Sequence, residues 1–187
     1  GILFNYSTFG KGNFRFTNIL MDEGYLKFYG SRFGDRNLSF AKTVFGKNSV
    51  DFDEAELGCG SYDFADTVFR GRASFANLRN IKMVKALSFR HASFDGAFTI
   101  SSEGTFPCVP DLVGTKTSHH TSLAELNCES PKTTHKQCFQ RSADEGDAER
   151  FRRLKELAEQ NRDFEKALDF KVAEMQAARW HGDYRWP

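Results

Sequence analysis

The sequence predicts a mainly β protein, a β-helix whose chain winds through stacked coils, closed at its C-terminal end by a helix or an αα-hairpin. Three observations predict this fold. A phenylalanine recurs every twelve residues, turn residues gather at a fixed place in each repeat, and the apolar spacing becomes helical after residue 143. Such periodicity decides the fold class, because a repeat unit buries its apolar face only by stacking on its neighbours.

The phenylalanine repeat runs six times without a slip. Its members are Phe4, Phe16, Phe28, Phe40, Phe52 and Phe64. A second apolar position follows each of them by five residues, and a third precedes each by two. Sixteen of the 20 Phe residues lie before residue 107, so one aromatic residue type builds most of the expected core.

Within each repeat the local pattern is that of a short strand followed by turns. Phe14-Arg15-Phe16 alternates apolar and polar residues, which puts both rings on one face of a strand. The positions between strands collect residues that tolerate a positive φ. They include Gly10, Gly12, Gly24, Gly34, Gly46, Gly58 and Gly60. A helix is disfavoured, because the Phe residues would surround it and each interior glycine would cost up to about 1 kcal/mol.

The space that the inward side chains need determines how many residues each coil contains. Twelve extended residues enclose a perimeter of at most about 40 Å, too narrow for three large inward side chains. Two repeats give a four-sided coil of about 24 residues, stacked roughly 4.8 Å from the next. We therefore expect residues 1–106 to form a little over four coils. Phe75 arrives one residue early, which predicts a bulge or small excursion near residues 76–86.

A small residue stands two positions before many of the core Phe or Leu residues, and a step of five links neighbouring core positions. Examples are Ser7-Thr8-Phe9, Thr43-Val44-Phe45, Ala55-Glu56-Leu57, Thr67-Val68-Phe69 and Ala92-Ser93-Phe94. This pattern resembles the pentapeptide-repeat family, although the steps here alternate between five and seven. The resemblance covers residues 1–106. It implies a right-handed quadrilateral β-helix with the Phe or Leu and the small residue inside.

Residues 107–142 lose the periodicity, and we expect an irregular connection there. The segment contains Cys108, His119, His120, Cys128, His135 and Cys138. Their spacing does not match the paired Cys and His ligands of a zinc site. No base-orienting pattern accompanies them, so we expect no catalytic, cofactor-binding or metal-binding residue. A disulfide such as Cys128–Cys138 and free thiols in a reducing cytoplasm both remain open.

Residues 143–187 have a helical apolar period. Asp147 is placed to cap a first helix, Asn161-Arg162-Asp163 interrupts it, and a second apolar stripe ends near Trp180. The first stripe is Phe151, Leu154, Leu157 and Ala158, and the second is Phe164, Ala167, Leu168, Val172 and Met175. We expect these stripes to face the rod, since a bare terminal coil exposes its core and an unpaired edge.

Charge narrows the classes of function. Residues 1–106 carry 13 Lys+Arg and 11 Asp+Glu, which disfavours both a basic nucleic-acid footprint and an acidic rod that imitates DNA. No apolar run is long enough to span a membrane. Asp51 and Asp53 flank the inward Phe52 and point outward on a convex face, whereas a catalytic pair needs a concave site. We therefore do not expect an enzyme.

The remaining interpretation is a non-catalytic scaffold or protein-interaction module of a bacterial pentapeptide-repeat protein. We expect a cytoplasmic protein that binds a protein partner or itself, without cofactor, nucleic acid or direct membrane contact. Because Ile2 and Phe4 already occupy core positions, we also expect the chain to be part of a longer one.

Two alternatives come from resemblance. The run Phe151-Arg152-Arg153-Leu154-Lys155, with Asp163, Phe170 and Glu174, resembles helices that follow pentapeptide repeats in some bacterial membrane proteins. It implies a cytoplasmic regulatory domain of a membrane-anchored protein. Some pentapeptide-repeat proteins inhibit a topoisomerase by DNA mimicry, which requires the acidic stripe that this chain lacks.

Overall fold

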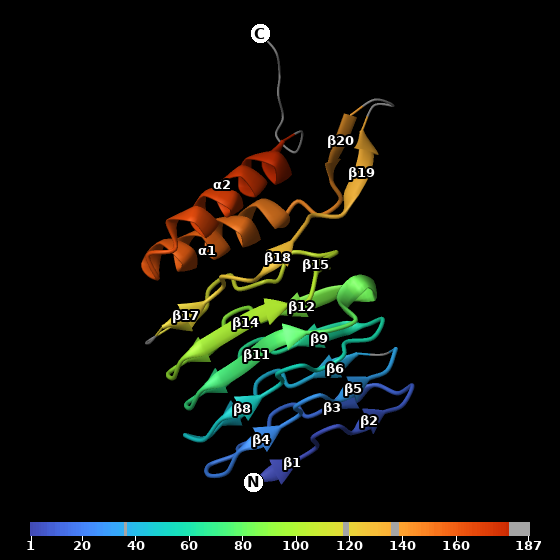
Figure 1. Ribbon diagram of the computed structural model, residues 1–187, viewed down its shortest axis with the longest axis vertical. Helices are drawn as coiled ribbons and strands as arrows, with labels where there is room; N and C mark the ends of the chain where they lie inside the picture. The colour runs from blue at the N-terminus through green and yellow to red at the C-terminus, as the bar shows by residue number, and fades with distance from the viewer. Residues whose placement is uncertain (36, 118–119, 136–138, 180–187) are drawn as a thin grey trace.

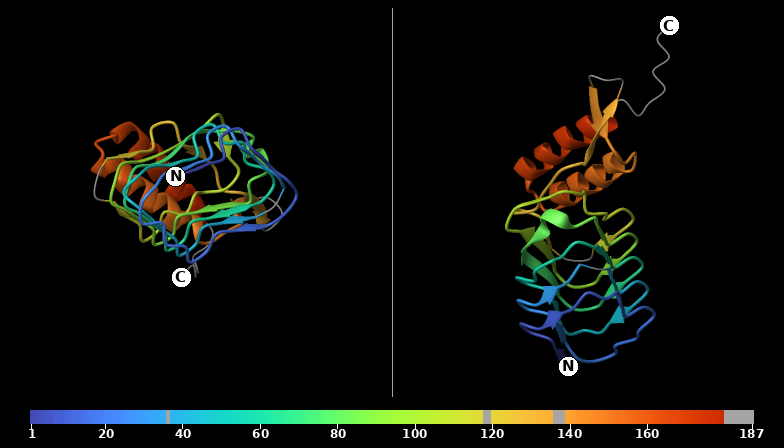
Figure 2. Two further views of the ribbon diagram at one scale, coloured as in Figure 1. Left: turned by 90° about the horizontal axis from the view of Figure 1, so that it is seen from below. Right: turned by 90° about the vertical axis from the view of Figure 1, so that its right-hand side faces the viewer.

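The computed structural model describes residues 1–35, 37–117, 120–135 and 139–179. It confirms a mainly β solenoid of parallel, stacked coils followed by two helices (Figure 1). Seen along its axis, the rod's coils overlay in one closed outline (Figure 2). Ile2 pairs with Leu26 and Leu26 with Val50, which confirms a coil of about 24 residues.

Each coil contributes short strands to four faces. The first face is a six-stranded parallel sheet of β1 (Ile2–Leu3), β4 (Leu26–Lys27), β8 (Val50–Asp51), β11 (Ala73–Leu78), β14 (Phe98–Ser102) and β17 (Thr121–Ser122). The second begins with β2 (Thr8–Phe9) and β5 (Arg32–Phe33) and continues through the bridges Arg32–Glu56 and Glu56–Arg79. The third contains β3 (Phe14–Arg15), β6 (Leu38–Ser39), β9 (Ser61–Asp63) and β12 (Ala86–Ser88). The fourth contains β7 (Val44–Phe45), β10 (Val68–Phe69), β13 (Ser93–Phe94) and β16 (Lys116–Thr117).

Stacked phenylalanine rings fill the interior. Phe28 and Phe52 stack with ring centroids 4.7 Å apart, and Phe52 and Phe75 at 4.9 Å. A second column contains Phe16, Phe40, Phe64 and Phe89, with centroids 4.9 to 5.5 Å apart. Successive members of the twelve-residue repeat therefore enter opposite walls. This is the physical reason that two repeats make one coil.

The small residue of the repeat lies inside from the second coil onward, as expected. Ala55, Thr67 and Ala92 are fully buried. The Oγ1 of Thr67 donates a 2.9 Å hydrogen bond to the carbonyl of Phe40 in the preceding coil. Hydroxyls at this position therefore bond one coil to the next.

Positive φ angles occur at a different place from the one we expected. They follow the inward Phe by two residues, at Tyr6, Asn18, Gly30, Lys42 and Glu54. Of the seven glycines that we expected in this role, which all lie in the described part of the chain, Gly24 alone has a positive φ. Gly34, Gly46 and Gly58 instead serve close coil-to-coil approach. A Cβ on Gly58 would lie 2.6 Å from the Phe33 carbonyl oxygen.

The rod is irregular near residues 76–86, where the early Phe75 predicted a bulge or small excursion. The register between β11 and β14 shifts between Phe75 and Leu78. A 3₁₀ turn, η1 (Ile81–Met83), follows, and Asn77 and Asn80 adopt left-handed backbone conformations. The excursion rejoins the solenoid at β12.

The coils continue beyond residue 106, contrary to the irregular connection that we expected over 107–142. β16 and β17 pair in parallel with β13 and β14, and β18 (Asn127–Cys128) pairs with β15 (Thr105–Phe106). Leu112, Leu123 and Leu126 are buried at inward positions, so leucine takes over from phenylalanine without ending the coil. An antiparallel hairpin of β19 (Lys132–His135) and β20 (Phe139–Ser142) follows. The division of the chain into domains at residues 1–106, 107–142 and 143–187 stays a prediction.

Two helices, α1 (Asp147–Gln160) and α2 (Phe164–Ala178), form an αα-hairpin over the last coil (Figure 1). Phe151, Leu154 and Leu157 of α1 are buried. Asp147 is the first helical residue rather than the N-cap, and its carboxylate accepts a bond from Ser142 Oγ. The break at residues 161–163 is confirmed, with the Asp163 side chain capping α2. Trp180 lies outside the described residues.

The ring columns predict a position-dependent cost of truncation. Phe52 is buried between rings above and below it, whereas Phe4 is half-buried in the first coil. We expect Phe52→Ala to lower the free energy of unfolding by about 3–5 kcal/mol and Phe4→Ala by less than half of that. Urea denaturation followed by circular dichroism measures both, and equal losses would contradict the stacking account.

The glycine column gives a matched pair of substitutions. Gly58 and Gly10 occupy the same position in different coils, but a Cβ at Gly10 meets nothing within 4 Å. We expect Gly58→Ala to destabilise the rod by about 1–3 kcal/mol through overpacking, and Gly10→Ala to have little effect. The midpoint of thermal unfolding distinguishes them, and a harmless Gly58→Ala would refute the close approach.

Candidate interaction surfaces at the two ends of the rod

The two carboxylates that flank Phe52 take part in hydrogen bonds of the rod's wall, and Asp53 bonds to the next coil. Asp53 Oδ1 accepts hydrogen bonds from Ser74 Oγ at 2.6 Å and from the Ala76 amide at 2.8 Å. Asp51 Oδ1 accepts from the Asp53 amide at 2.9 Å, and burial raises the pKa of Asp51. Asp53 thus bonds its own coil to the next one, and both carboxylates have a structural role in the wall of the rod.

Charged side chains on the flanks of the rod pair across coils. Arg32 Nε lies 2.9 Å from Glu56 Oε2, and Arg79 bridges Glu54 at 2.9 Å and Glu103 at 2.8 Å. The signs alternate along the rod. The flank therefore offers a mixed, internally paired surface.

The cysteine and histidine cluster of residues 107–142 is only partly described. Within the described residues, no group of three or more His, Cys, Asp or Glu side chains could hold a metal ion. Cys59, Cys108 and Cys128 are free thiols, and His119 and Cys138 lie outside the described residues. The free thiol at Cys128 does not support the Cys128–Cys138 disulfide, one of the two alternatives that the sequence left open. Burial raises the pKa of Cys108 to about 11 and that of Cys128 to about 12.

The first coil leaves the apolar core open at one end of the rod. Ile2 is 46% exposed, Leu3 56% and Leu20 69%. Behind them lies a cavity of about 130 Å³, lined by apolar side chains and Thr43. We call this region the N-terminal surface and define it by Ile2, Leu3, Phe4, Phe16, Ile19, Leu20 and Met21.

Sheet edges surround the N-terminal surface. β1, β2 and β3 are each the terminal strand of their sheet within the described chain. The amides of Ile2 and Phe4 donate to Tyr25 and Lys27 of the second coil, so their bonding is directed into the rod. The opposite edge presents backbone groups for pairing, beside apolar side chains.

The other end of the rod is closed by α1. Arg153 Nη2 donates a 2.7 Å hydrogen bond to the Thr115 carbonyl, and the Thr121 amide donates to Asn161 Oδ1 at 2.9 Å. These contacts supply partners to the backbone of the last coils while Leu154 and Leu157 cover the core. The sequence predicted the helix from its apolar period but gave no indication of these polar contacts.

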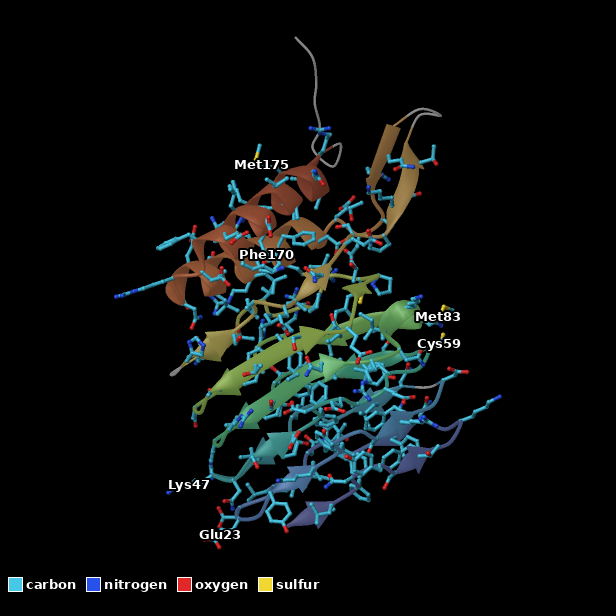
Figure 3. The ribbon with its side chains drawn as sticks, viewed as in Figure 1. Glu23, Lys47, Cys59, Met83, Phe170 and Met175 are labelled. Atoms are coloured by element: carbon cyan, nitrogen blue, oxygen red, sulfur yellow. The ribbon has the colours of Figure 1, made fainter. Side chains whose placement is uncertain are left out.

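The second helix presents its apolar stripe to solvent, contrary to our expectation that this stripe closes the rod. Phe164 is 71% exposed, Leu168 64%, Val172 48% and Met175 62%. We call these four residues the α2 stripe. Met175 points away from the rod, whereas Phe170 points toward α1 (Figure 3).

The packing of α2 explains this orientation. Because α1 already covers the last coil, α2 packs on α1 through Phe170 and the small residues Ala167 and Ala177. The Phe151 and Phe170 ring centroids lie 6.5 Å apart. Glu174, also on this face, bonds Arg152 at 2.9 Å and Lys171 at 3.1 Å. Burial alone would raise the pKa of Glu174, but these two cations lower it.

Comparison of the chain with protein-family models, curated proteins and solved structures gives no match. Within the described residues, no helix is long and apolar enough to cross a membrane. The structure is consistent with the coil of the pentapeptide-repeat fold, in which the Phe or Leu and the small residue point inward.

The raised thiol pKa values predict slow alkylation. Cys108 and Cys128 stay protonated at pH 8 and react poorly with iodoacetamide in the folded protein, because the thiolate is the nucleophile. We expect both to become labelled at the rate of free cysteine in urea. Peptide mass spectrometry after timed alkylation measures each site, and fast labelling of either in the native protein would contradict this account.

Proposed function

We propose that this chain is a non-catalytic protein-interaction module, a rigid scaffold that binds a partner polypeptide at the N-terminal surface. The observation that carries the proposal is the open first coil. There, unpaired sheet edges lie beside exposed apolar side chains, including Leu3 at 56% and Leu20 at 69% exposure. The partner is a polypeptide that supplies a strand or coil with alternating apolar residues.

The contrast between the two ends of the rod supports this proposal. At the last coil, Arg153 and Asn161 bond backbone groups and α1 covers the core. The first coil has no equivalent among the described residues. An extended segment that adds to β1 or β3 would supply main-chain hydrogen bonds, and its alternate side chains would fill the 130 Å³ cavity.

The charge arrangement disfavours the DNA-mimicry alternative. Arg32 and Arg79 neutralise Glu56 and Glu103 along the second face, so acidic side chains do not form a continuous stripe there. A regulatory role beside a membrane anchor stays a prediction from the resemblance of the helices, and a cytoplasmic location also stays a prediction.

Site-specific photo-crosslinking tests the proposal. A benzophenone amino acid placed at Leu3, at the N-terminal surface, is compared with one at Met83, which is 62% exposed on the side of the rod. We expect a defined adduct in the producing cells from position 3 and none from position 83. The crosslinked partner peptide should have alternating apolar residues.

Two outcomes would overturn the proposal. Equal labelling at the two positions would show that exposure alone determines capture. The absence of any adduct at Leu3, with the folded state verified by circular dichroism, would show that the N-terminal surface binds no partner.

A further inference from the structure

We propose that the α2 stripe is a self-association surface, on which α2 packs antiparallel against α2 of a second copy of this chain. The inference goes beyond the proposed function and does not depend on it, since it concerns the opposite end of the rod. It follows from the size, spacing and surroundings of the four stripe residues.

The stripe is a continuous apolar surface. Four large side chains, with exposures from 48% to 71%, follow one another along α2 at steps of four, four and three residues. These steps keep them on one face of the helix, as in the ridge that one packed helix presents to another. The opposite face, with Ala167, Phe170 and Ala177, is buried against the rest of the protein.

The stripe fits its own two-fold copy. An antiparallel pairing centred between Leu168 and Val172 places Leu168 opposite Val172 of the second copy. The same pairing brings Phe164 to within one residue of Met175 of the second copy. A closed two-fold contact requires one patch that complements itself, and the order aromatic, aliphatic, aliphatic, thioether provides it. Methionine also adapts its shape to an aromatic neighbour.

The charged side chains beside the stripe permit the contact. Lys171 bonds Glu174 at 3.1 Å within the same helix, so no unpaired cation enters the interface. Glu165, Asp169 and Gln176 are exposed on the other flank and stay at the solvated rim. The contact therefore buries apolar groups without trapping a lone charge.

The available area places the contact among small, reversible interfaces. At their observed exposures the four side chains offer on the order of 500 Å² per copy, against roughly 800 Å² per partner in a standard interface. With its rim the contact falls near the lower end of specific interfaces. We therefore expect a reversible dimer with a dissociation constant of about 1 to about 100 µM. Two rods joined by their helical ends would present two N-terminal surfaces pointing outward, which favours bivalent binding.

Sedimentation velocity from about 1 µM to about 300 µM tests the proposal on the full chain. We expect a concentration-dependent monomer–dimer equilibrium. Met175→Glu and Leu168→Glu should each raise the dissociation constant by at least about 30-fold, because a carboxylate would enter the apolar contact. Met83→Glu is the matched control, since Met83 and Met175 are both 62% exposed, and it should leave the equilibrium unchanged.

A second variant separates the two ends of the rod. Leu3→Glu alters the N-terminal surface and should leave the dimer intact, so failure of this inference is distinguishable from failure of the proposed function. A monomer throughout the concentration range would overturn the inference. So would a dimer that survives Leu168→Glu or one that dissociates with Leu3→Glu.

Crosslinking tests the antiparallel orientation. A benzophenone amino acid at Phe164 should form its adduct with Met175 of the second copy, identified from a mixture of isotopically light and heavy chains. An adduct between the two copies of position 164 would indicate parallel helices and contradict the proposed packing.

Discussion

The stacking of phenylalanine rings at the spacing of adjacent strands is the interaction on which the rest of this structure depends. Parallel strands lie about 4.8 Å apart, and rings such as Phe28 and Phe52 stack at 4.7 Å, so backbone pairing and ring contact reinforce each other. The small residues and the closely approaching glycines let the coils reach this distance. The result is a rigid rod whose interior is filled, so that only its outer walls and its two ends can contact a partner.

The two ends differ in how the core is covered and in how the backbone groups of the sheet edges are bonded. Helix α1 covers the last coil with leucines and supplies polar partners through Arg153 and Asn161. The first coil leaves β1, β2 and β3 as terminal strands within the described chain. Since the walls are internally paired, the ends carry the proposed contacts: a partner strand at the N-terminal surface and a second copy at the α2 stripe.

Sequence reasoning predicted the coil because two phenylalanine periods of twelve residues make one coil of about 24 residues. It ended the rod at residue 106 because the twelve-residue spacing stops there. Leu112, Leu123 and Leu126 still occupy inward positions, but they do not follow that spacing. It placed the α2 stripe against the rod because helical spacing identifies an apolar face but not its neighbour. Phe170 and two alanines pack that helix instead. Sequence reasoning expected a protein partner without fixing the binding surface, and the exposure of the α2 stripe was visible only in three dimensions.

The central claim is that each stacked coil is stabilised by its neighbours and that the helices close one end of the rod. Site-resolved hydrogen exchange tests this claim most directly. The amides of Phe28 and Phe52 donate to the next coil, the Phe98 amide donates to the His120 carbonyl, and the Leu126 amide donates to the Leu123 carbonyl. The account predicts that protection rises from the first coil to the centre and stays high through residue 128. Equal fraying at both ends, or rapid exchange throughout residues 107–128, would contradict it.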